Sequence, residues 1–293
     1  MNHLLTVIIS FILIIIFVID NNVVINGASY GLMLWYDNVL PILLPFMLIS
    51  GILANNINTI KSNINKEKLS ILTTILLGVL CGYPLGAKTC VDFVQKNNYS
   101  KYVGNMILPL CNNISPMFLS GYIAHNILNN NTPLLTIILF IYTPYILLLL
   151  IRILFTKKSN NQCFNTDIHI QEKKSEHDYI FNSIIQITYV GVYIMICSII
   201  IEFIYLIPTY LEPYRTFIAG ITEITRGTLI VQQQKFNENL KTALILALTS
   251  FGGISSILQT NKVINKSGLS ICQYVITKII CATLTFTMVI LFI

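Results

Sequence analysis

Two long apolar segments of this chain are each interrupted near their centre by glycine. The first interruption begins at Gly82, within residues 69–95, and the second at Gly252, within residues 239–264. The two glycines lie 170 positions apart, and each has an apolar arm on both sides. Apolar segments interrupted at corresponding positions in two halves are typical of transporter binding sites. The pattern predicts two inverted pseudo-repeats, with a kinked span or a re-entrant hairpin at each glycine.

The composition places the chain in a membrane. Of its 293 residues 55% are hydrophobic and only 10% are charged, whereas a soluble domain carries about 25% charged residues. The net charge of +6 comes mostly from short polar connections, so no basic stripe predicts a nucleic-acid partner. We expect an all-α polytopic protein whose surface meets the lipid bilayer. The expected full-length spans are 4–19, 31–54, 101–128, 133–155, 181–207 and 268–293.

Polar connections divide the chain into four parts. Residues 1–30 are expected to form an N-terminal transmembrane helix and loop, and residues 31–155 the first repeat. Residues 156–178 have mixed charge and no apolar periodicity, which is typical of a solvated linker. Their lysines place this linker in the cytoplasm by the positive-inside rule. Residues 179–293 are expected to form the second repeat, although 211–231 is polar enough to lie at the interface or inside the bundle.

The two glycine loops are candidate binding sites for an anion. A helix that restarts after a break has free backbone N–H groups at its N-terminus, and these favour negative charge. Glycine lets a ligand approach the backbone closely, although each loop taken alone also fits an ordinary turn between helices. The candidate residues at the loops are Gly82, Tyr83, Gly86, Lys88, Gly252, Gly253 and Ser255.

An uncharged polar cluster interrupts segment 101–128. Asn112, Asn113 and Ser115 lie there in otherwise apolar sequence, just before Pro116. Polar groups buried without partners cost several kcal/mol, so these side chains need water, a ligand or freed backbone as partners. Ligand binding and satisfaction of the carbonyls released by Pro116 both remain open at this point.

Charged residues inside apolar segments usually face a cavity or pair with one another. Glu223 and Arg226 are three positions apart, so on one helix they can pair locally; a ligand role for Glu223 stays open beside that. Lys278 lies within the apolar segment 268–293 and has no partner near it in the sequence.

Five motifs resemble those of the sporulation integral membrane proteins of the nucleoside-recognition (Gate) domain class. Residues 82–88, Gly-Tyr-Pro-Leu-Gly-Ala-Lys, are similar to its Gly-aromatic-Pro-x-Gly-Ala-Lys signature. The other four, in the family's order, are 40–46 (Leu-Pro-Ile-Leu-Leu-Pro-Phe), 112–118 (Asn-Asn-Ile-Ser-Pro-Met-Phe), 223–227 (Glu-Ile-Thr-Arg-Gly) and 251–255 (Phe-Gly-Gly-Ile-Ser) followed by Gln259.

The resemblance implies a transporter of a small anionic metabolite, foremost dipicolinic acid during spore formation. It places the protein in the bacterial cell membrane or the outer forespore membrane. The wider class is similar to concentrative nucleoside transporters, which implies re-entrant hairpins at 69–95 and 239–264 and a site that includes Glu223 and Gln259. Members of the class often assemble, so a homo-oligomer is an option; a coupling ion is left unassigned.

Two other functions compete with anion transport. A carrier of nucleosides or related heterocycles would use Glu223, Asn112 and Gln259 to bind ribose or base edges, and would tolerate Lys88→Gln. A non-transporting membrane scaffold needed for sporulation would need no pocket. An enzyme is not expected, because the sequence has no nucleophile–base arrangement, phosphate loop or histidine cluster with metal spacing, and no cofactor or metal is implied.

Overall fold

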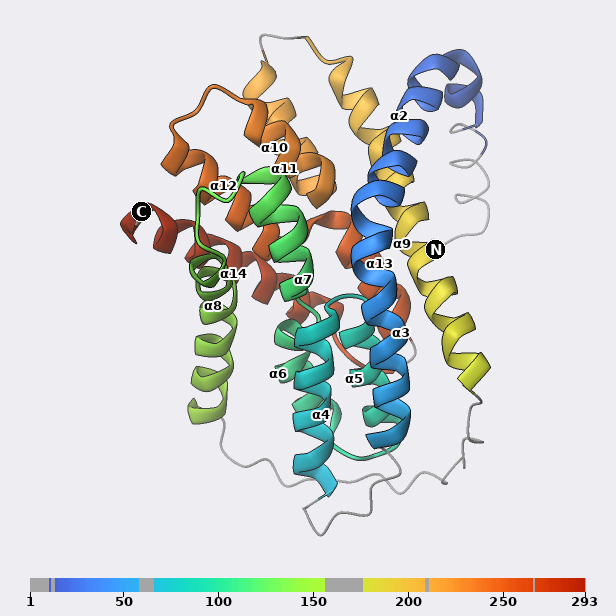
Figure 1. Cartoon of the computed structure of the whole chain (residues 1–293), viewed down its shortest axis with the longest axis vertical. Coiled ribbons are helices and arrows are strands. Elements are labelled where there is room, and N and C mark those ends of the chain that lie inside the picture. Colours follow the sequence, from blue (N-terminus) through green and yellow to red (C-terminus); the bar gives the residue numbers. More distant parts are fainter. Residues whose placement is uncertain are drawn as a thin grey trace.

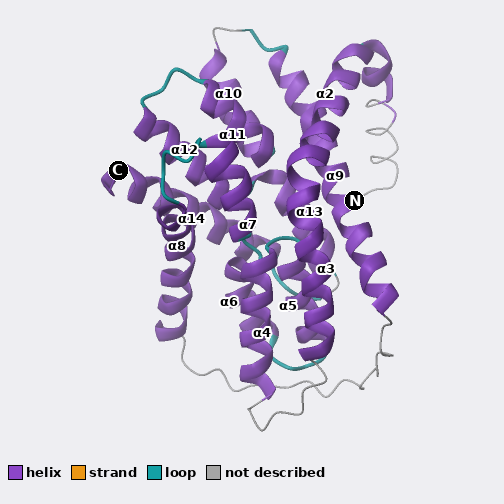
Figure 2. Cartoon of the chain, in the orientation of Figure 1, coloured by secondary structure: helices purple, strands orange, loops and turns teal. Residues whose placement is uncertain are grey.

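The computed structural model describes residues 11, 14–57, 66–155, 176–208, 211–265 and 267–292, and regular structure in these ranges is entirely helical (Figure 1, Figure 2). The elements are α2 (Asn21–Leu34), the π-helical turn η1 (Trp35–Val39), α3 (Leu40–Ile57), α4 (Lys66–Cys81), α5 (Leu85–Gln95), α6 (Lys101–Cys111), α7 (Pro116–Phe118), the π-helical η2 (Leu119–Ile127), α8 (Leu134–Phe155), α9 (Glu176–Tyr205), α10 (Glu212–Thr222), α11 (Ile224–Gln233), α12 (Glu238–Phe251), α13 (Gly253–Ile264) and α14 (Ile271–Phe292).

Five of the described helical segments are long and apolar enough to cross a membrane. Large apolar side chains on them face outward, including Leu154 (81% exposed) and Leu291 (77% exposed), as a lipid-facing surface requires. The chain is therefore an all-α integral membrane protein, and the prediction of this class is confirmed. The five segments are Asn21–Ile49, Leu134–Phe155, Ser183–Tyr205, Glu238–Ile264 and Ile271–Phe292.

The predicted boundaries differ from the structure near the N-terminus and at the linker. Most of the expected span 4–19 lies outside the described residues. Residues 21–30, expected in a loop, belong to α2, because the apolar sequence after Asp20 continues the helix into η1. Of the expected linker, 156–175 lies outside the described residues, and 176–178 already forms the start of α9.

Helices α4 and α5 fold back on each other at Gly82. The two helices pack together along their length. Their far ends are also joined: Asn98 Nδ2 donates to Ser70 Oγ at 2.9 Å, and the hydroxyls of Thr74 and Tyr99 are 3.0 Å apart. The first glycine break is thus the tip of a helical hairpin (Figure 1).

A second, shorter hairpin is formed by α10 and α11, with its tip at Glu223. A Cβ added to Gly227 would lie 2.5 Å from Gly220 Cα, so the two helices touch through glycine backbone. At the open end Gln234 Nε2 lies 3.5 Å from Glu212 Oε1. The tip residues Glu223 and Arg226 of the polar segment 211–231 are buried in the bundle, whereas Tyr214 and Phe217 on α10 face outward. Its sequence did not indicate this geometry.

The two remaining breaks interrupt helices that do not fold back. After α6, residues 112–115 are unwound before α7 begins. After α12, Gly252 joins two helices whose main neighbours differ: α12 packs mostly on α14, α11 and α8, whereas α13 packs mostly on α5, α9 and α10. Residues 239–264 therefore form the kinked span that the sequence allowed, and not the hairpin that the resemblance implies. A glycine break permits a bend in many directions, and its sequence does not specify which.

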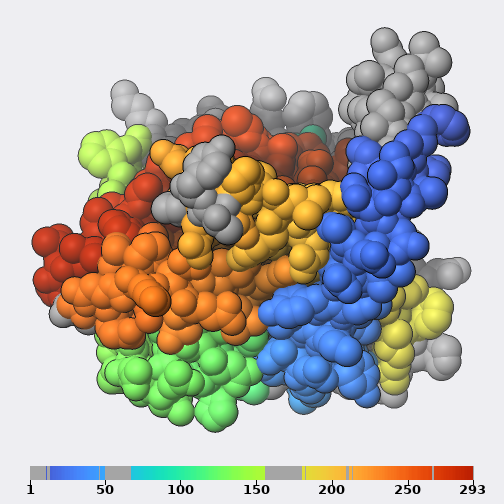
Figure 3. Space-filling view, turned by 90° about the horizontal axis from the view of Figure 1, so that it is seen from above, coloured from blue at the N-terminus to red at the C-terminus, as the bar shows by residue number. Residues whose placement is uncertain are grey.

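The two halves of the chain are interleaved. Helix α2 packs along α9, α3 also packs on α9, and η2 reaches α11. Figure 3 shows the same arrangement on one face, where α2 and α3 lie beside segments of the second half. The main apolar core is shared by both halves and includes Tyr122 and Tyr145, both almost fully buried. This interleaving brings all four helix breaks to the middle of the molecule.

Candidate functional site

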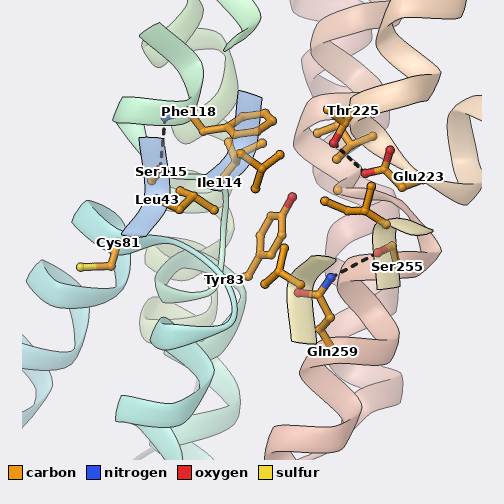
Figure 4. Close-up of a pocket in the computed structure, with 15 residues that line it drawn as sticks. Leu43, Cys81, Tyr83, Ile114, Ser115, Phe118, Glu223, Thr225, Ser255 and Gln259 are labelled. Carbon is orange, nitrogen blue, oxygen red and sulfur yellow. Dashed lines mark hydrogen bonds between the residues drawn. The ribbon is translucent and has the colours of Figure 1, made fainter. Parts of the chain in front are cut away.

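The four breaks surround one small cavity (Figure 4). It is lined by Tyr83, Ser115, Glu223, Gly252 and Gln259, together with apolar side chains. Figure 4 shows Tyr83 projecting between Ile114 on one side and Glu223, Ser255 and Gln259 on the other. The cavity holds about 20 Å³, which is room for about one water molecule. In this conformation the centre of the protein is polar and nearly closed.

The glycines of the first hairpin meet protein backbone. A Cβ on Gly86 would lie 2.0 Å from the carbonyl oxygen of Cys111, and one on Gly82 would lie 2.8 Å from that of Asn113. Gly82 has a φ of +71°, which L side chains rarely adopt. Gly82 and Gly86 were predicted to contact substrate, but the structure uses their missing side chains to seat the hairpin on the break after α6.

The N-terminus of α5, the first predicted anion site, is already occupied by the protein. The backbone N–H of Ala87 donates to Asn112 Oδ1 at 3.0 Å, and that of Tyr83 donates to the Asn113 carbonyl at 3.0 Å. These N–H groups are therefore not available to a ligand. At these two N–H groups, the neighbouring break therefore supplies the acceptors that the prediction assigned to an anion.

Asn112 is a fully buried structural link. Its Nδ2 donates to Thr260 Oγ1 at 2.7 Å and to the Tyr274 hydroxyl at 3.1 Å, and its Oδ1 accepts from Ala87. The Tyr274 hydroxyl in turn donates to the Asn112 carbonyl at 3.1 Å. One amide thus joins α5, α13 and α14. Of the two options left open by the sequence, the structure supports internal satisfaction for Asn112.

Asn113 has a different role. Its Oδ1 accepts from Lys278 Nζ at 2.9 Å, while its Nδ2 is buried without a hydrogen-bond partner among the described residues. Lys278 also donates to the Ser250 carbonyl at 3.3 Å, and its Nζ lies 5.1 Å from the centre of the Tyr145 ring. The intramembrane lysine is thus held where α12 ends, across from the break after α6.

Ser115 and Glu223 cap the helices that follow their breaks. Ser115 Oγ accepts from Phe118 N at 3.2 Å. Glu223 accepts from Thr225 Oγ1 and from the backbone N–H of Arg226, both at 2.8 Å. Each side chain satisfies a helix N-terminus, as N-cap residues do, and each also lines the cavity.

The expected side-chain pair between Glu223 and Arg226 does not form. The Arg226 guanidinium instead pairs with Glu202, donates to the Ser198 carbonyl at 2.8 Å and lies 4.4 Å from the centre of the Tyr30 ring. The reason is that Glu223 is the N-cap of α11, so it meets the backbone of Arg226 while the guanidinium extends toward α2 and α9. The Glu223 carboxylate is left facing the cavity.

The break after α12 is the open one. Gly252 and Gly253 both have positive φ, and α13 begins without a side-chain cap. A Cβ on Gly253 would lie 3.3 Å from backbone at the tip of α10 and α11, so Gly253 seats the second hairpin. Ser255 Oγ accepts from Gln259 Nε2 at 3.2 Å, while Gln259 Oε1 is buried without a partner among the described residues.

A larger pocket adjoins the cavity at Gln259. It encloses about 320 Å³ and is lined by Lys88, Lys262, Tyr189 and Tyr193 as well as Gln259. Lys262 Nζ lies 3.4 Å from the centre of the Tyr189 ring. Lys88, predicted beside the substrate, is therefore placed in this outer pocket, which we call the vestibule.

The structure thus sorts the predicted residues into three groups. The cavity brings together Tyr83, Ser115, Glu223, Gly252, Ser255 and Gln259; the vestibule takes Lys88; and Gly82, Gly86, Asn112, Asn113 and Gly253 join the breaks to one another. Lys262, in the last turn of α13, was missed because its sequence context does not set it apart from the other lysines of residues 235–266. Comparison of the chain with protein-family models, curated proteins and solved structures finds no match. The family resemblance therefore rests on the five motifs.

Proposed function

We propose that the protein is a membrane transporter of a small anionic metabolite. The observation that carries the proposal is a vestibule with two lysines, Lys88 and Lys262, which opens toward a polar cavity at Gln259. Irregular backbone at membrane depth is tolerated where it is buried in protein or lines a cavity. Four helix breaks around one cavity match the way in which transporters build substrate sites.

The proposed architecture consists of two inverted pseudo-repeats with re-entrant hairpins. In each half a hairpin tip is seated by glycine on a broken helix: the tip at Gly82 on the break at Asn113, and the tip at Glu223 on the break at Gly253. This pairs α4–α5 with α10–α11 and the break after α6 with the break after α12. Asn112 and Gly252 are 140 positions apart, so the two repeats align with an offset of 140 residues. This offset replaces the one of 170 residues that aligned Gly82 with Gly252.

The leading substrate is dipicolinate, which the family resemblance supports and whose two carboxylates suit a lysine-lined entrance. The cavity of about 20 Å³ is too small for it. Transport therefore requires a wider conformation, in which Gln259 and Tyr83 separate. The outer forespore membrane is the proposed location.

A nucleoside is the second candidate, because the cavity also presents acceptors. The Glu223 carboxylate and the unpartnered Gln259 Oε1 favour a ligand with hydroxyl or N–H donors. Ribose hydroxyls would satisfy both. A non-transporting scaffold gains less support, because it gives no reason for a buried polar cavity.

Uptake into proteoliposomes tests these alternatives. Full-length protein should carry labelled dipicolinate, with saturation and with competition by unlabelled dipicolinate. Uptake of uridine alone would support the nucleoside carrier and contradict anion transport. If neither compound crosses, and none of a panel of other small carboxylates does, then the transporter proposal fails in favour of the scaffold.

A further inference from the structure

Lys278 is a buried lysine without a carboxylate partner among the described residues. Its side chain is 0% exposed in the middle of α14. Neither of the ion pairs Arg226–Glu202 and Lys241–Glu238 involves Lys278. Its two acceptors, Asn113 Oδ1 and the Ser250 carbonyl, are neutral. A buried charge with only neutral partners is costly in a membrane protein, and such residues are functional by default.

Unused hydrogen-bond donors gather around this ammonium. A lysine has three N–H donors, and two of them have acceptors here. The amide of Asn113 that accepts from Lys278 carries the Nδ2 that has no partner in the described part of the chain, and Asn113 is 0% exposed. Buried donors without acceptors are rare in proteins and call for a missing partner. The partner that fits is an acceptor with negative charge.

The uncapped N-terminus of α13 lies beside the same ammonium. A Cβ built on Gly252 would be 3.9 Å from Lys278 Nζ, and Gly252 lines the central cavity. The helix that starts after Gly252 has no side-chain cap, whereas α7 and α11 are capped by Ser115 and Glu223. Gly252 is therefore the point at which a ligand in the cavity comes nearest to both a free helix N-terminus and the lysine.

We propose that Lys278, Asn113 Nδ2 and the N-terminus of α13 form the anchor that binds a carboxylate of the transported anion. This inference rests on the proposed function and assigns its charge recognition to the centre of the protein. The vestibule lysines then attract the anion, and Lys278 binds it. Glu223, at the hairpin tip that is seated on Gly253, also lines the cavity and faces the part of the substrate that carries hydrogen-bond donors or water.

Binding to purified full-length protein in nanodiscs tests the anchor. The probes are dipicolinate, its neutral diamide and formate, the smallest carboxylate. Lys278→Met keeps the length of the side chain and removes the charge. Loss of a charge-assisted hydrogen bond should weaken dipicolinate binding by about 10- to 100-fold, and the preference for dipicolinate over the diamide should disappear.

Asn113→Asp gives a second test that does not depend on removal of the lysine. The new carboxylate keeps the acceptor for Lys278 and supplies a built-in counter-ion, so the protein should fold and retain its thermal stability. The bound anion loses its partner, and its affinity should fall by about 10- to 100-fold. Asn105→Asp is the matched control: Asn105 Oδ1 accepts from Ser270 N at 2.8 Å, outside the anchor, and affinity should stay within about twofold of wild type.

The outcomes separate this inference from the proposed function. If wild type binds dipicolinate and Asn113→Asp binds it equally well, the anchor is wrong and anion transport stands. If formate binding depends on Lys278 but dipicolinate does not bind, the anchor stands and the substrate is a different carboxylate. If wild type binds none of the carboxylates but does bind uridine, then the anchor and anion transport are both wrong.

Discussion

The break after α6 and the break after α12 both interrupt apolar sequence but differ in how they use polar groups. At the first break, Asn112 has all of its polar atoms paired and Ser115 caps the next helix. At the second, α13 starts uncapped at Gly252, and Gln259 Oε1 has no partner among the described residues. Asn113 is the exception at the first break, because its Nδ2 has no partner among the described residues and its Oδ1 accepts from Lys278 beside the second break. Paired polar groups stabilise the fold, whereas unpaired ones are free to bind a ligand. The two breaks thus teach that unwound helix alone does not identify a binding site.

The largest expected effect comes from filling the contact that seats the first hairpin. Gly86→Ala places a Cβ about where the Cys111 carbonyl lies, at 2.0 Å, and backbone cannot move aside as a side chain can. We expect a loss of about 3 kcal/mol, at the upper end of overpacking effects, measured by thermal unfolding in detergent.

Gly121→Ala is the control for this substitution. The nearest atom to its new Cβ is the flexible end of Ile42, at 2.9 Å. The melting temperature of Gly121→Ala should therefore change far less than that of Gly86→Ala. Equal melting temperatures for the two variants would contradict the view that the first hairpin is held by backbone contact.

The next effect compares one side chain from each break. Asn112→Ala leaves Ala87 N, Thr260 and Tyr274 short of a partner and should cost about 3 kcal/mol of stability. Ser255→Ala removes a single acceptor of Gln259, and should cost less than about 1 kcal/mol while it weakens substrate binding by about 3- to 10-fold. Thermal unfolding and binding isotherms on both variants check this. Stability loss of the same size at the two positions would remove the distinction between a structural break and a binding break.

The sequence predicted the membrane class and the positions of three of the breaks because each depends on local composition. Apolar length fixes the spans, and Gly82, Asn112 and Gly252 are unusual within apolar sequence. The direction in which the chain leaves a break depends on distant packing. The chain reverses at Gly82 because the residues around it fit against the break after α6. Nothing in the sequence near Gly252 distinguishes that glycine from a hairpin tip.

The second hairpin and the anchor were beyond sequence reasoning for a related reason. Glu223 forms a tip in a segment whose polarity fits several locations. Lys278 and Asn113 are 165 positions apart, and neither residue alone indicates the other. Lys278 could be recognised as unusual from its apolar surroundings, but its partner is set by the crossing of α14 with the break after α6.

A moderate effect is expected at the glycine of the second break. Gly252 has a φ of +83°, and its Cβ would meet Ser256 Oγ at 2.8 Å. Gly252→Ala should cost about 1–2 kcal/mol, because L residues are strained in the left-handed region. Gly252→Asn should cost less in backbone strain, because asparagine adopts the left-handed conformation more readily than alanine. Thermal unfolding of both variants ranks them, and the opposite order would mean that contact with Ser256 outweighs backbone strain.

The smallest effect is expected in the vestibule, where charge acts at a distance. Lys88→Gln and Lys262→Gln should leave stability unchanged within about 0.5 kcal/mol, since Lys262 is exposed and Lys88 lines a large pocket. Each should raise the KM for dipicolinate uptake by about two- to fivefold at low ionic strength, because a cationic entrance concentrates an anion.

Salt distinguishes this attraction from direct binding. At high ionic strength the difference between each vestibule variant and wild type should shrink toward zero, because mobile ions screen exposed charges. The loss of dipicolinate affinity in Lys278→Met should persist at high ionic strength, since a buried site is screened much less. Lys101→Gln, outside the vestibule, is the control for net charge. If the KM change in Lys88→Gln does not depend on salt, then Lys88 belongs to the binding site and not to the entrance. The division between an attracting vestibule and an anchoring centre would then be wrong.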